Sequence, residues 1–234
     1  MEKIIYLLWR DPSLSAEDHG LHLRADLAPR LRQAGAQRLT INLDDAAVQP
    51  AAGLRQVHWQ PQPSALLQLW LDSASDRSRE PLDRLVAAHC ARHAAYLVTE
   101  SQPLRNTLHP PQTGSRTAGW SQIALLERPQ ALDYAAWIEV WLNSHTQVAR
   151  ETQSHFEYVQ NVVARVLTPQ APPVDAIVEE CFPAAAMTDP YAFFDAVGDE
   201  AKFQRNLQRM MESVHRFIDM QHIEVIPTSQ YPLY

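Results

Sequence analysis

The stretch WIEVWLNSHTQVARETQSHFEYVQN, residues 137–161, decides the fold because a helical pattern passes directly into a strand-like one. Trp137, Trp141 and His145 stand four residues apart, and on a helix this spacing places all three on one face. The two tryptophans predict that this face is buried, so His145 enters an apolar environment. The strand-like run carries two polar side chains, Tyr158 and Asn161. Together, the helix face and the strand predict the wall of a pocket.

The elements around this stretch are predicted to occur twice in the same order. The first set is a strand, a helix, two strands, a helix and a strand, at residues 3–9, 15–34, 37–43, 65–71, 81–93 and 96–100. The second set has the same order, at residues 121–126, 134–152, 156–167, 176–182, 199–219 and 223–226, with a short helical turn at 190–196. In both sets a Pro-containing loop separates the second and third strands. This βαββαβ order is that of a ferredoxin-like unit.

The duplicated order predicts an α+β fold of two ferredoxin-like repeats, at residues 1–101 and 121–234, joined by a linker at 102–120. Each repeat covers only one face of its sheet with helices, so the other face must be buried against another part of the protein. The two bare faces can meet within one chain and form an intrachain α/β barrel with a central cavity. A two-layer sandwich that pairs with a second copy, as a homodimer, is the alternative.

Composition restricts the classes of function. The chain has 234 residues, of which 46% are hydrophobic, and a net charge of −7, which argues against nucleic acid as a partner. No run of about 18 apolar residues predicts a membrane span, and the apolar run at residues 4–9 is too short for a signal peptide. Cys90 and Cys181 belong to no CxxC motif. Free thiols in a reducing compartment, and so a cytoplasmic location, are expected.

A resemblance to a known family rests on motifs of the second half. Arg128-Pro129 ends a predicted strand, Trp141 and His145 form a Trp-x-x-x-His helix motif, and Tyr-Val-Gln-Asn follows at residues 158–161. With Ile-Val-Glu-Glu at residues 177–180, this pattern resembles the EthD family of dimeric α/β-barrel proteins. The resemblance covers roughly residues 121–231.

The first half resembles the family only in its element order and in the Arg10-Asp11-Pro12 run that ends its first strand. Aligning Leu14 with Leu132 places Leu23 opposite Trp141 and Leu27 opposite His145. The first repeat is therefore predicted to be degenerate, with leucines filling the space that a pocket occupies in the second repeat.

The resemblance implies a protein that binds a small apolar, aromatic or polyketide-like molecule in an apolar barrel pocket, in a catabolic or biosynthetic pathway. The activity it implies is proton-transfer chemistry without a cofactor, of the isomerase, dehydratase or decarboxylase type. One alternative is a non-catalytic accessory protein that serves an oxygenase, and another is a haem-binding barrel. The fold alone does not choose among them.

His145 is the predicted acid or base, since an imidazole titrates near neutral pH, and Tyr158 is the predicted second catalytic group. For His145 the alternative is a core histidine bonded to a backbone carbonyl. Trp137, Trp141, Asn161 and Glu179 are the predicted substrate-binding residues.

Strand parity adds a restriction to these predictions. Tyr158 and Asn161 have opposite parity, so only one of them can face the cavity of a regular strand. Glu179 and Glu180 also point to opposite faces, and the one near His145 would raise the pKa of the imidazole.

No metal site and no cofactor motif is predicted. His89 and His93 stand four residues apart on a predicted helix, but nothing nearby supplies a third ligand. The sequence contains no G-x-G-x-x-G, P-loop, G-x-S-x-G or H-E-x-x-H motif.

Overall fold

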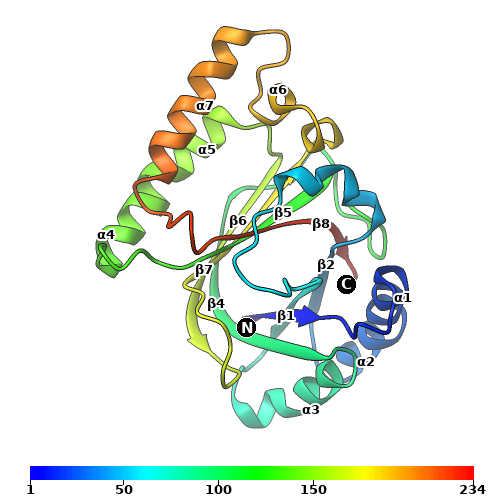
Figure 1. Cartoon of the computed structure of the whole chain (residues 1–234). Coiled ribbons are helices and arrows are strands. Elements are labelled where there is room, and N and C mark those ends of the chain that lie inside the picture. Colours follow the sequence, from blue (N-terminus) through cyan, green and yellow to red (C-terminus); the bar gives the residue numbers. More distant parts are fainter.

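Eight antiparallel strands close into one barrel in a computed structural model that describes residues 1–234 (Figure 1). The strands are β1 (Glu2–Trp9), β2 (Arg38–Leu43), β3 (Ala65–Leu71), β4 (Arg92–Leu104), β5 (Trp120–Leu126), β6 (Glu157–Val166), β7 (Ala176–Phe182) and β8 (Glu224–Pro232). Around the barrel they follow the order β1-β3-β2-β8-β5-β7-β6-β4. The predicted α+β barrel, closed within one chain, is confirmed.

Two seams join the halves of the barrel. One is the pairing of β2 with β8, and the other is the pairing of β4 with β6. Both β4 and β8 extend beyond the predicted strands at residues 96–100 and 223–226, because each pairs with a strand of the other half as well as its own. Sequence patterns within one half do not contain this information.

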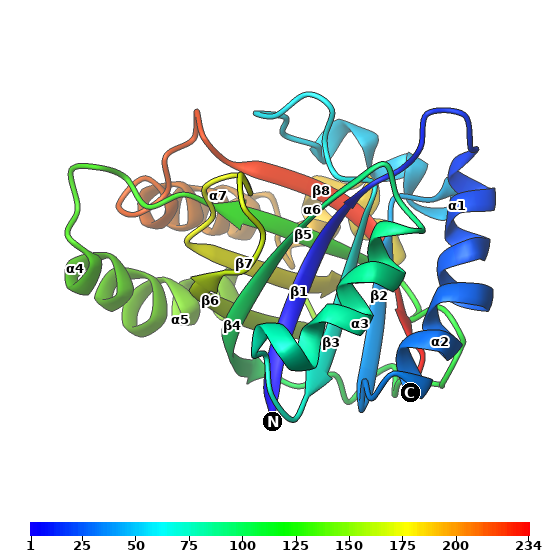
Figure 2. The same cartoon turned by 90° about the horizontal axis from the view of Figure 1, so that it is seen from below.

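Helices α1, α2 and α3 lie on the opposite side of the barrel from α4, α5 and α7 in both views (Figures 1 and 2). The first half contributes α1 (Ala16–His22), η1 (Leu23–Leu27), α2 (Ala28–Gln33), η2 (Ala46–Leu54) and α3 (Asp76–Ala87). The second half contributes α4 (Tyr134–Ile138), η3 (Glu139–His145), α5 (Thr146–Thr152), η4 (Ala184–Met187), α6 (Pro190–Phe193) and α7 (Glu200–Val214). None of these helices has the length and apolar character needed to cross a bilayer.

The first helix of each half is continuous and contains a π-helical segment. η1 lies between α1 and α2, and η3 lies between α4 and α5, with helical backbone at every junction. Each helix begins at a side-chain N-cap: Ser15 accepts from the amide of Asp18, and Asp133 accepts from the amide of Ala136. These helices span the predicted ranges.

The helix predicted at residues 81–93 begins earlier and ends earlier. Ser75 caps it by accepting from the amide of Ser78, and Pro81 lies inside it rather than at its start. The helix ends at Ala87, so His93 belongs to β4 and the predicted pair of helical histidines does not form.

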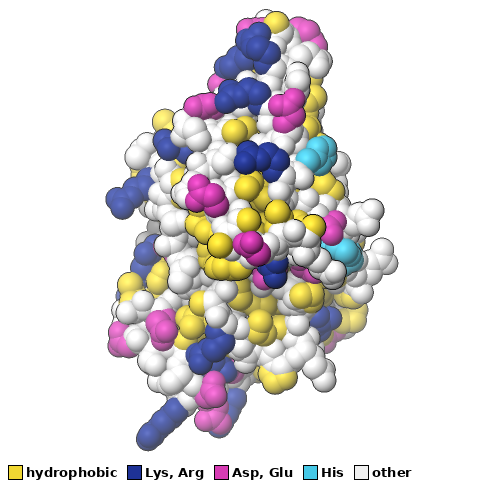
Figure 3. All heavy atoms as spheres, turned by 90° about the vertical axis from the view of Figure 1, so that its left-hand side faces the viewer, with side chains coloured by type: hydrophobic (Ala, Val, Ile, Leu, Met, Phe, Trp, Pro, Cys, Tyr) yellow, Lys and Arg dark blue, Asp and Glu magenta, His cyan; other side chains and the backbone are white.

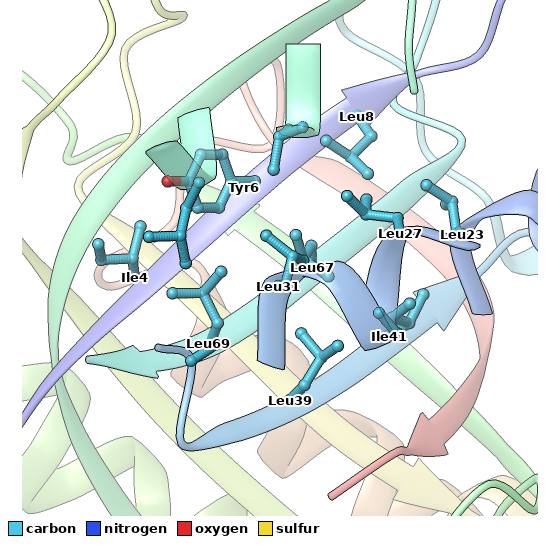
Figure 4. Packing of buried hydrophobic residues seen from close by; sticks show 14 of the residues in the cluster. Ile4, Tyr6, Leu8, Leu23, Leu27, Leu31, Leu39, Ile41, Leu67 and Leu69 are labelled. Atoms are coloured by element: carbon cyan, nitrogen blue, oxygen red, sulfur yellow. The ribbon is translucent and has the colours of Figure 1, made fainter. Parts of the chain in front are cut away.

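The helix–sheet space of the first half is a solid core of 19 buried residues. Leu23, Leu27 and Leu31 extend from η1 and α2 toward the sheet (Figure 4). There they meet apolar side chains such as Leu67 and Ile41, which are completely buried. The prediction that leucines fill this space agrees with the packing.

The barrel interior is filled by inward-facing side chains. At one end an apolar cluster of 12 buried residues includes Ile5, Leu7 and Tyr96. At the other end polar side chains bond to one another; for example, Gln68 Nε2 lies 2.8 Å from Asn42 Oδ1. Protein side chains therefore fill the space where a central cavity was predicted, and the main pocket lies outside the barrel.

Candidate active site outside the barrel

The main pocket lies between the outer face of the second-half sheet and the helices that cover it. Its volume is about 590 Å³, and 18 of its 27 lining residues are hydrophobic. Ala124, Val178 and Val225 form part of its floor, on β5, β7 and β8. The expected apolar pocket is therefore outside the barrel, because side chains fill the barrel interior.

The first half supplies one wall of this pocket. Pro50, Gly53 and Leu54 of η2 line it, together with Gln56. Backbone hydrogen bonds of 3.1 and 3.0 Å between Gln56 and Val225 attach this segment to β8. The pocket thus needs both halves of the chain, although most of its lining comes from the second.

The remaining wall is apolar and rich in methionine. Four of the five methionines of the chain line the pocket, namely Met187, Met210, Met211 and Met220. Met211 and Met220 are also exposed at the surface. Figure 3 shows the face of the molecule on the side of the second-half helices, where hydrophobic side chains gather across the middle. The helical pattern around Met210 does not distinguish core from pocket lining, because both require an apolar helix face.

The predicted helix face divides between pocket and core. Trp141 and His145 line the pocket, whereas Trp137 does not. Trp137 is completely buried, 5.3 Å from the Trp141 ring, and its Nε1 donates to the carbonyl of Phe217 at 3.0 Å. The π-helical turn is held by Thr146, whose hydroxyl donates to the carbonyl of Trp141 at 3.0 Å.

His145 is a buried imidazole with a side-chain partner. Its Nδ1 lies 2.9 Å from the hydroxyl oxygen of Ser213 on α7, and its ring lies 4.6 Å from that of Phe217. Burial, and then the charge of Arg216, lowers the pKa of His145 to about 4. The imidazole is therefore neutral at pH 7. Its partner is a hydroxyl group, not the backbone carbonyl of the alternative interpretation.

A polar row crosses the floor of the pocket on three neighbouring strands. Tyr158 of β6 pairs with Glu180 of β7, and Glu180 pairs with Gln122 of β5. Gln122 Nε2 donates to Glu180 Oε2 at 3.1 Å, and the Tyr158 hydroxyl accepts from Gln160 at 3.3 Å. All three members of the row line the pocket.

Burial shifts the pKa values of Glu180 and Tyr158, the two titratable members of this row. It raises the pKa of Glu180 to about 7, opposed only by the hydrogen bond from Gln122. Burial and the nearby Glu180 charge also raise the pKa of Tyr158, so its phenol stays neutral. Glu180 is thus a carboxyl group in an apolar pocket that can bind or release a proton near pH 7.

Two of the predicted binding residues point away from the pocket. Asn161 Oδ1 accepts from Lys3 Nζ at 2.7 Å inside the barrel. Glu179 is also inside, where Gln68 and Gln230 donate to its two oxygens at 2.8 and 2.9 Å. The structure therefore brings together Trp141, His145, Tyr158 and Glu180, and it separates Asn161 and Glu179 from them.

The sequence did contain the signal for Glu180. Parity already placed Glu179 and Glu180 on opposite faces, but only the register of β6 with β7 shows that Glu180 shares a face with Tyr158. Gln122 had no signal of its own, because a polar residue near the start of a mostly apolar strand is ordinary.

No group of three or more His, Cys, Asp or Glu side chains is placed to hold a metal ion. His89, one of the two histidines considered in the sequence, bonds instead to Asp26 Oδ2 at 2.9 Å and to the carbonyl of Leu85 at 2.7 Å.

Comparisons with known proteins agree with this fold. Residues 129–221 match the family model described as the EthD domain. No curated protein matches the sequence. A crystal structure titled as an anthrone oxidase-like protein has a TM-score of 0.60 at 7% identity, over 99% of this chain and 93% of that one. At this identity the similarity shows the fold alone.

Two further solved structures are similar at lower TM-scores. One is titled a putative monooxygenase from Lactobacillus acidophilus NCFM, with a TM-score of 0.48 and 8% identity over 99% of this chain and 96% of that one. The other is titled a putative chlorite dismutase, with a TM-score of 0.47 and 10% identity over 98% and 95% of the two chains. The match to the EthD domain model covers residues 129–221 and spans Trp141, His145, Tyr158 and Glu180.

Proposed function

We propose that this chain binds a small aromatic or polyketide-like molecule in the pocket outside the barrel and moves a proton on it without a cofactor. One observation carries the proposal: Glu180 places an ionisable carboxyl group on the floor of an otherwise largely apolar pocket of about 590 Å³. A proton-transfer group works best when its pKa lies near the working pH, and that of Glu180 is about 7.

In this mechanism the ionised Glu180 takes a proton from an acidic carbon or hydroxyl of the bound molecule. Negative charge then develops on the molecule, and the neutral Tyr158 phenol can donate a hydrogen bond to an oxygen that carries it. His145 is uncharged and is held by Ser213, so we assign it to orienting the molecule, with Trp141 supplying an aromatic surface. The proton returns from Glu180 to a different atom in an isomerisation or leaves with a departing group in a dehydration.

A second candidate function is binding without catalysis, as an accessory protein for an oxygenase. The methionine-rich wall favours it, because methionine side chains adapt to ligands of different shapes. The haem-binding alternative is tested by a visible absorbance spectrum of the purified protein.

We also propose that the chain is a tandem of two ferredoxin-like repeats, at residues 1–101 and 121–234. The strand orders β4-β1-β3-β2 and β8-β5-β7-β6 support it. So do matching contacts at the first strand ends: the Arg10 guanidinium donates to the carbonyl of Leu14, and that of Arg128 to the carbonyl of Leu132. The two π-helical segments fall at corresponding places in the two helices.

Anthrone is a suitable probe for the activity, because it is a flat aromatic ketone with an acidic methylene group and one structural neighbour is titled anthrone oxidase-like. Quenching of tryptophan fluorescence measures its binding, and NMR measures exchange of its methylene hydrogens for deuterium. We expect the protein to speed this exchange, and Glu180→Gln to lower the rate by ~10²–10⁴-fold with binding kept.

Two variants serve as controls. Ala124→Phe places a ring on the pocket floor and should abolish binding, whereas Glu200→Gln on the surface should change nothing. Full exchange activity in Glu180→Gln would remove Glu180 from the mechanism. Binding with no accelerated exchange in the unmodified protein would favour the accessory function.

A further inference from the structure

His155 is a buried imidazole that the proposed mechanism does not use. It follows α5 and precedes β6, its side chain is 0% exposed, and neither ring nitrogen has a hydrogen-bond partner. Aromatic rings surround it, with the Tyr158 ring at 5.4 Å and the Phe182 ring at 5.7 Å. Unpaired buried polar atoms are rare and unfavourable, so this one needs an explanation.

The polar group within reach is the pocket carboxylate. His155 Nδ1 lies 3.6 Å from Glu180 Oε1, while Gln122 Nε2 holds the other oxygen, Oε2, at 3.1 Å. An N–H···O bond has a length of about 2.7–3.2 Å, so a small rotation of either side chain completes the contact. The two oxygens of Glu180 would then be held from opposite sides by neutral donors.

We propose that His155 is a positioning residue for Glu180: from behind the pocket wall, its Nδ1–H donates to Oε1 of the ionised carboxylate and fixes the orientation in which Glu180 receives a proton. His155 does not line the pocket, so it acts on the bound molecule only through Glu180. The inference rests on the proposed function for the reaction that Glu180 serves, but its geometry does not depend on which molecule binds.

The charges around the imidazole fit this role. Arg150 of α5, His145 of η3, Tyr158 of β6 and Glu180 of β7 are the titratable groups around it. Burial, followed by the charges of Arg150 and His145, lowers the pKa of His155 to about 4, so the ring is neutral at pH 7. A neutral donor orients a carboxylate without the strong attraction that a cation exerts, and therefore leaves Glu180 able to bind a proton.

The test is a titration of Glu180 that requires no ligand. Carbon-13 NMR of protein labelled at its glutamate carboxyls gives the midpoint, with the Glu180 signal assigned by its absence in Glu180→Gln. His155→Phe removes the donor from the charged form and should raise the midpoint by about one to two pH units. His155→Gln keeps an N–H donor and should restore much of the shift.

The matched control is His109→Leu. His109 packs against Phe156, next to His155 in the chain, with its ring at 4.7 Å, but it is exposed. This variant should leave the Glu180 midpoint unchanged. An unchanged midpoint in folded His155→Phe would overturn the proposal, since a purely structural histidine would lower only the melting temperature.

A measurement on the unmodified protein covers the case in which His155→Phe does not fold. Nitrogen-15 NMR should find the His155 ring protonated at Nδ1 and its shifts moving as Glu180 titrates. A ring protonated at Nε2, with shifts that ignore the titration, contradicts the proposal. Because neither experiment involves turnover, failure of the anthrone assay and failure of this inference are distinguishable. Where exchange is observed, the acid limb of its pH profile should move to higher pH in His155→Phe.

Discussion

The two halves of this chain have corresponding strand orders, but the space between helices and sheet is filled in the first half and holds a pocket in the second. In the first half η1 presents Leu23 and Leu27 to the sheet and the space closes into a solid core (Figure 4). In the second half η3 presents Trp141 and His145, and the space holds a pocket. A π-helical segment occurs in both helices, so it does not by itself create a site. Side-chain identity decides what the segment does.

The connections between elements add to this difference. In the first half only residues 72–75 separate β3 from α3, whereas residues 183–199 separate β7 from α7 and contain η4 and α6. Met187, Phe193 and Phe194 from this longer connection line the pocket. The connection between β2 and β3 contains η2, which covers another side of the pocket. These connecting segments enclose the pocket, while the sheet provides only its floor.

The largest expected effect on stability tests the contrast between core and pocket. Leu27 is completely buried, so Leu27→Ala should lower the free energy of unfolding by about 2–5 kcal/mol through lost burial and a new cavity. Leu54→Ala removes the same atoms from a half-buried side chain that already borders the pocket, and should lower it by only ~1 kcal/mol. Chemical denaturation of both variants measures this, and equal losses would mean that the second-half space is not a pocket in solution.

The next effect comes from Glu180, the carboxyl group of the pocket. The leucine-filled core of the first half has no corresponding carboxyl group. The pKa of Glu180 is raised from 4.5 to about 7, so the folded state keeps a proton that the unfolded state releases. Stability should therefore fall as pH rises from about 4.5 to about 7, by about 3 kcal/mol in all. Glu180→Gln removes this dependence, so the variant should match the unmodified protein near pH 4 and exceed it in stability at pH 8.

Denaturation of the two proteins at several pH values checks the sign. The buried histidines contribute in the opposite direction, because the pKa of His145 is lowered to about 4 and its contribution to stability is lost as pH falls below about 6.5. Their effect cancels in the difference between the two proteins. A difference that stays constant from pH 4 to pH 8 would show that Glu180 is not desolvated.

The sequence predicted the strands, the first helix of each half and the helix face that lines the pocket. It could do so because these features depend on local periodicity: Trp141 and His145 are one turn apart, and burial of one implies burial of the other. The predicted ranges at 65–71 and 176–182 agree with β3 and β7. The EthD resemblance, read from the same motifs, is confirmed by the family match.

What the sequence did not predict depends on contacts between distant segments. The barrel interior is filled because side chains from all eight strands meet there, and the choice between Glu179 and Glu180 depends on the register of β7 with its neighbours. The wall that η2 provides comes from the other half of the chain. The burial of His155 also depends on a distant segment, since the Phe182 ring of β7 lies 5.7 Å from its ring.

The smallest expected effect concerns how the pocket histidine is held. Ser213 is buried, and its hydroxyl oxygen lies 2.9 Å from His145 Nδ1, so Ser213→Ala leaves that nitrogen without a partner. The free energy of unfolding should fall by ~1–2 kcal/mol, as for one unpaired buried polar group. Ser144→Ala is the matched control, because Ser144 accepts from Arg216 at the surface and its loss should change stability by less than about 0.5 kcal/mol. In the first half the position corresponding to His145 is Leu27, which needs no polar partner. If Ser213→Ala is as neutral as Ser144→Ala, then the His145 ring does not depend on α7 for its orientation, and the role assigned to it in holding the bound molecule loses its structural basis.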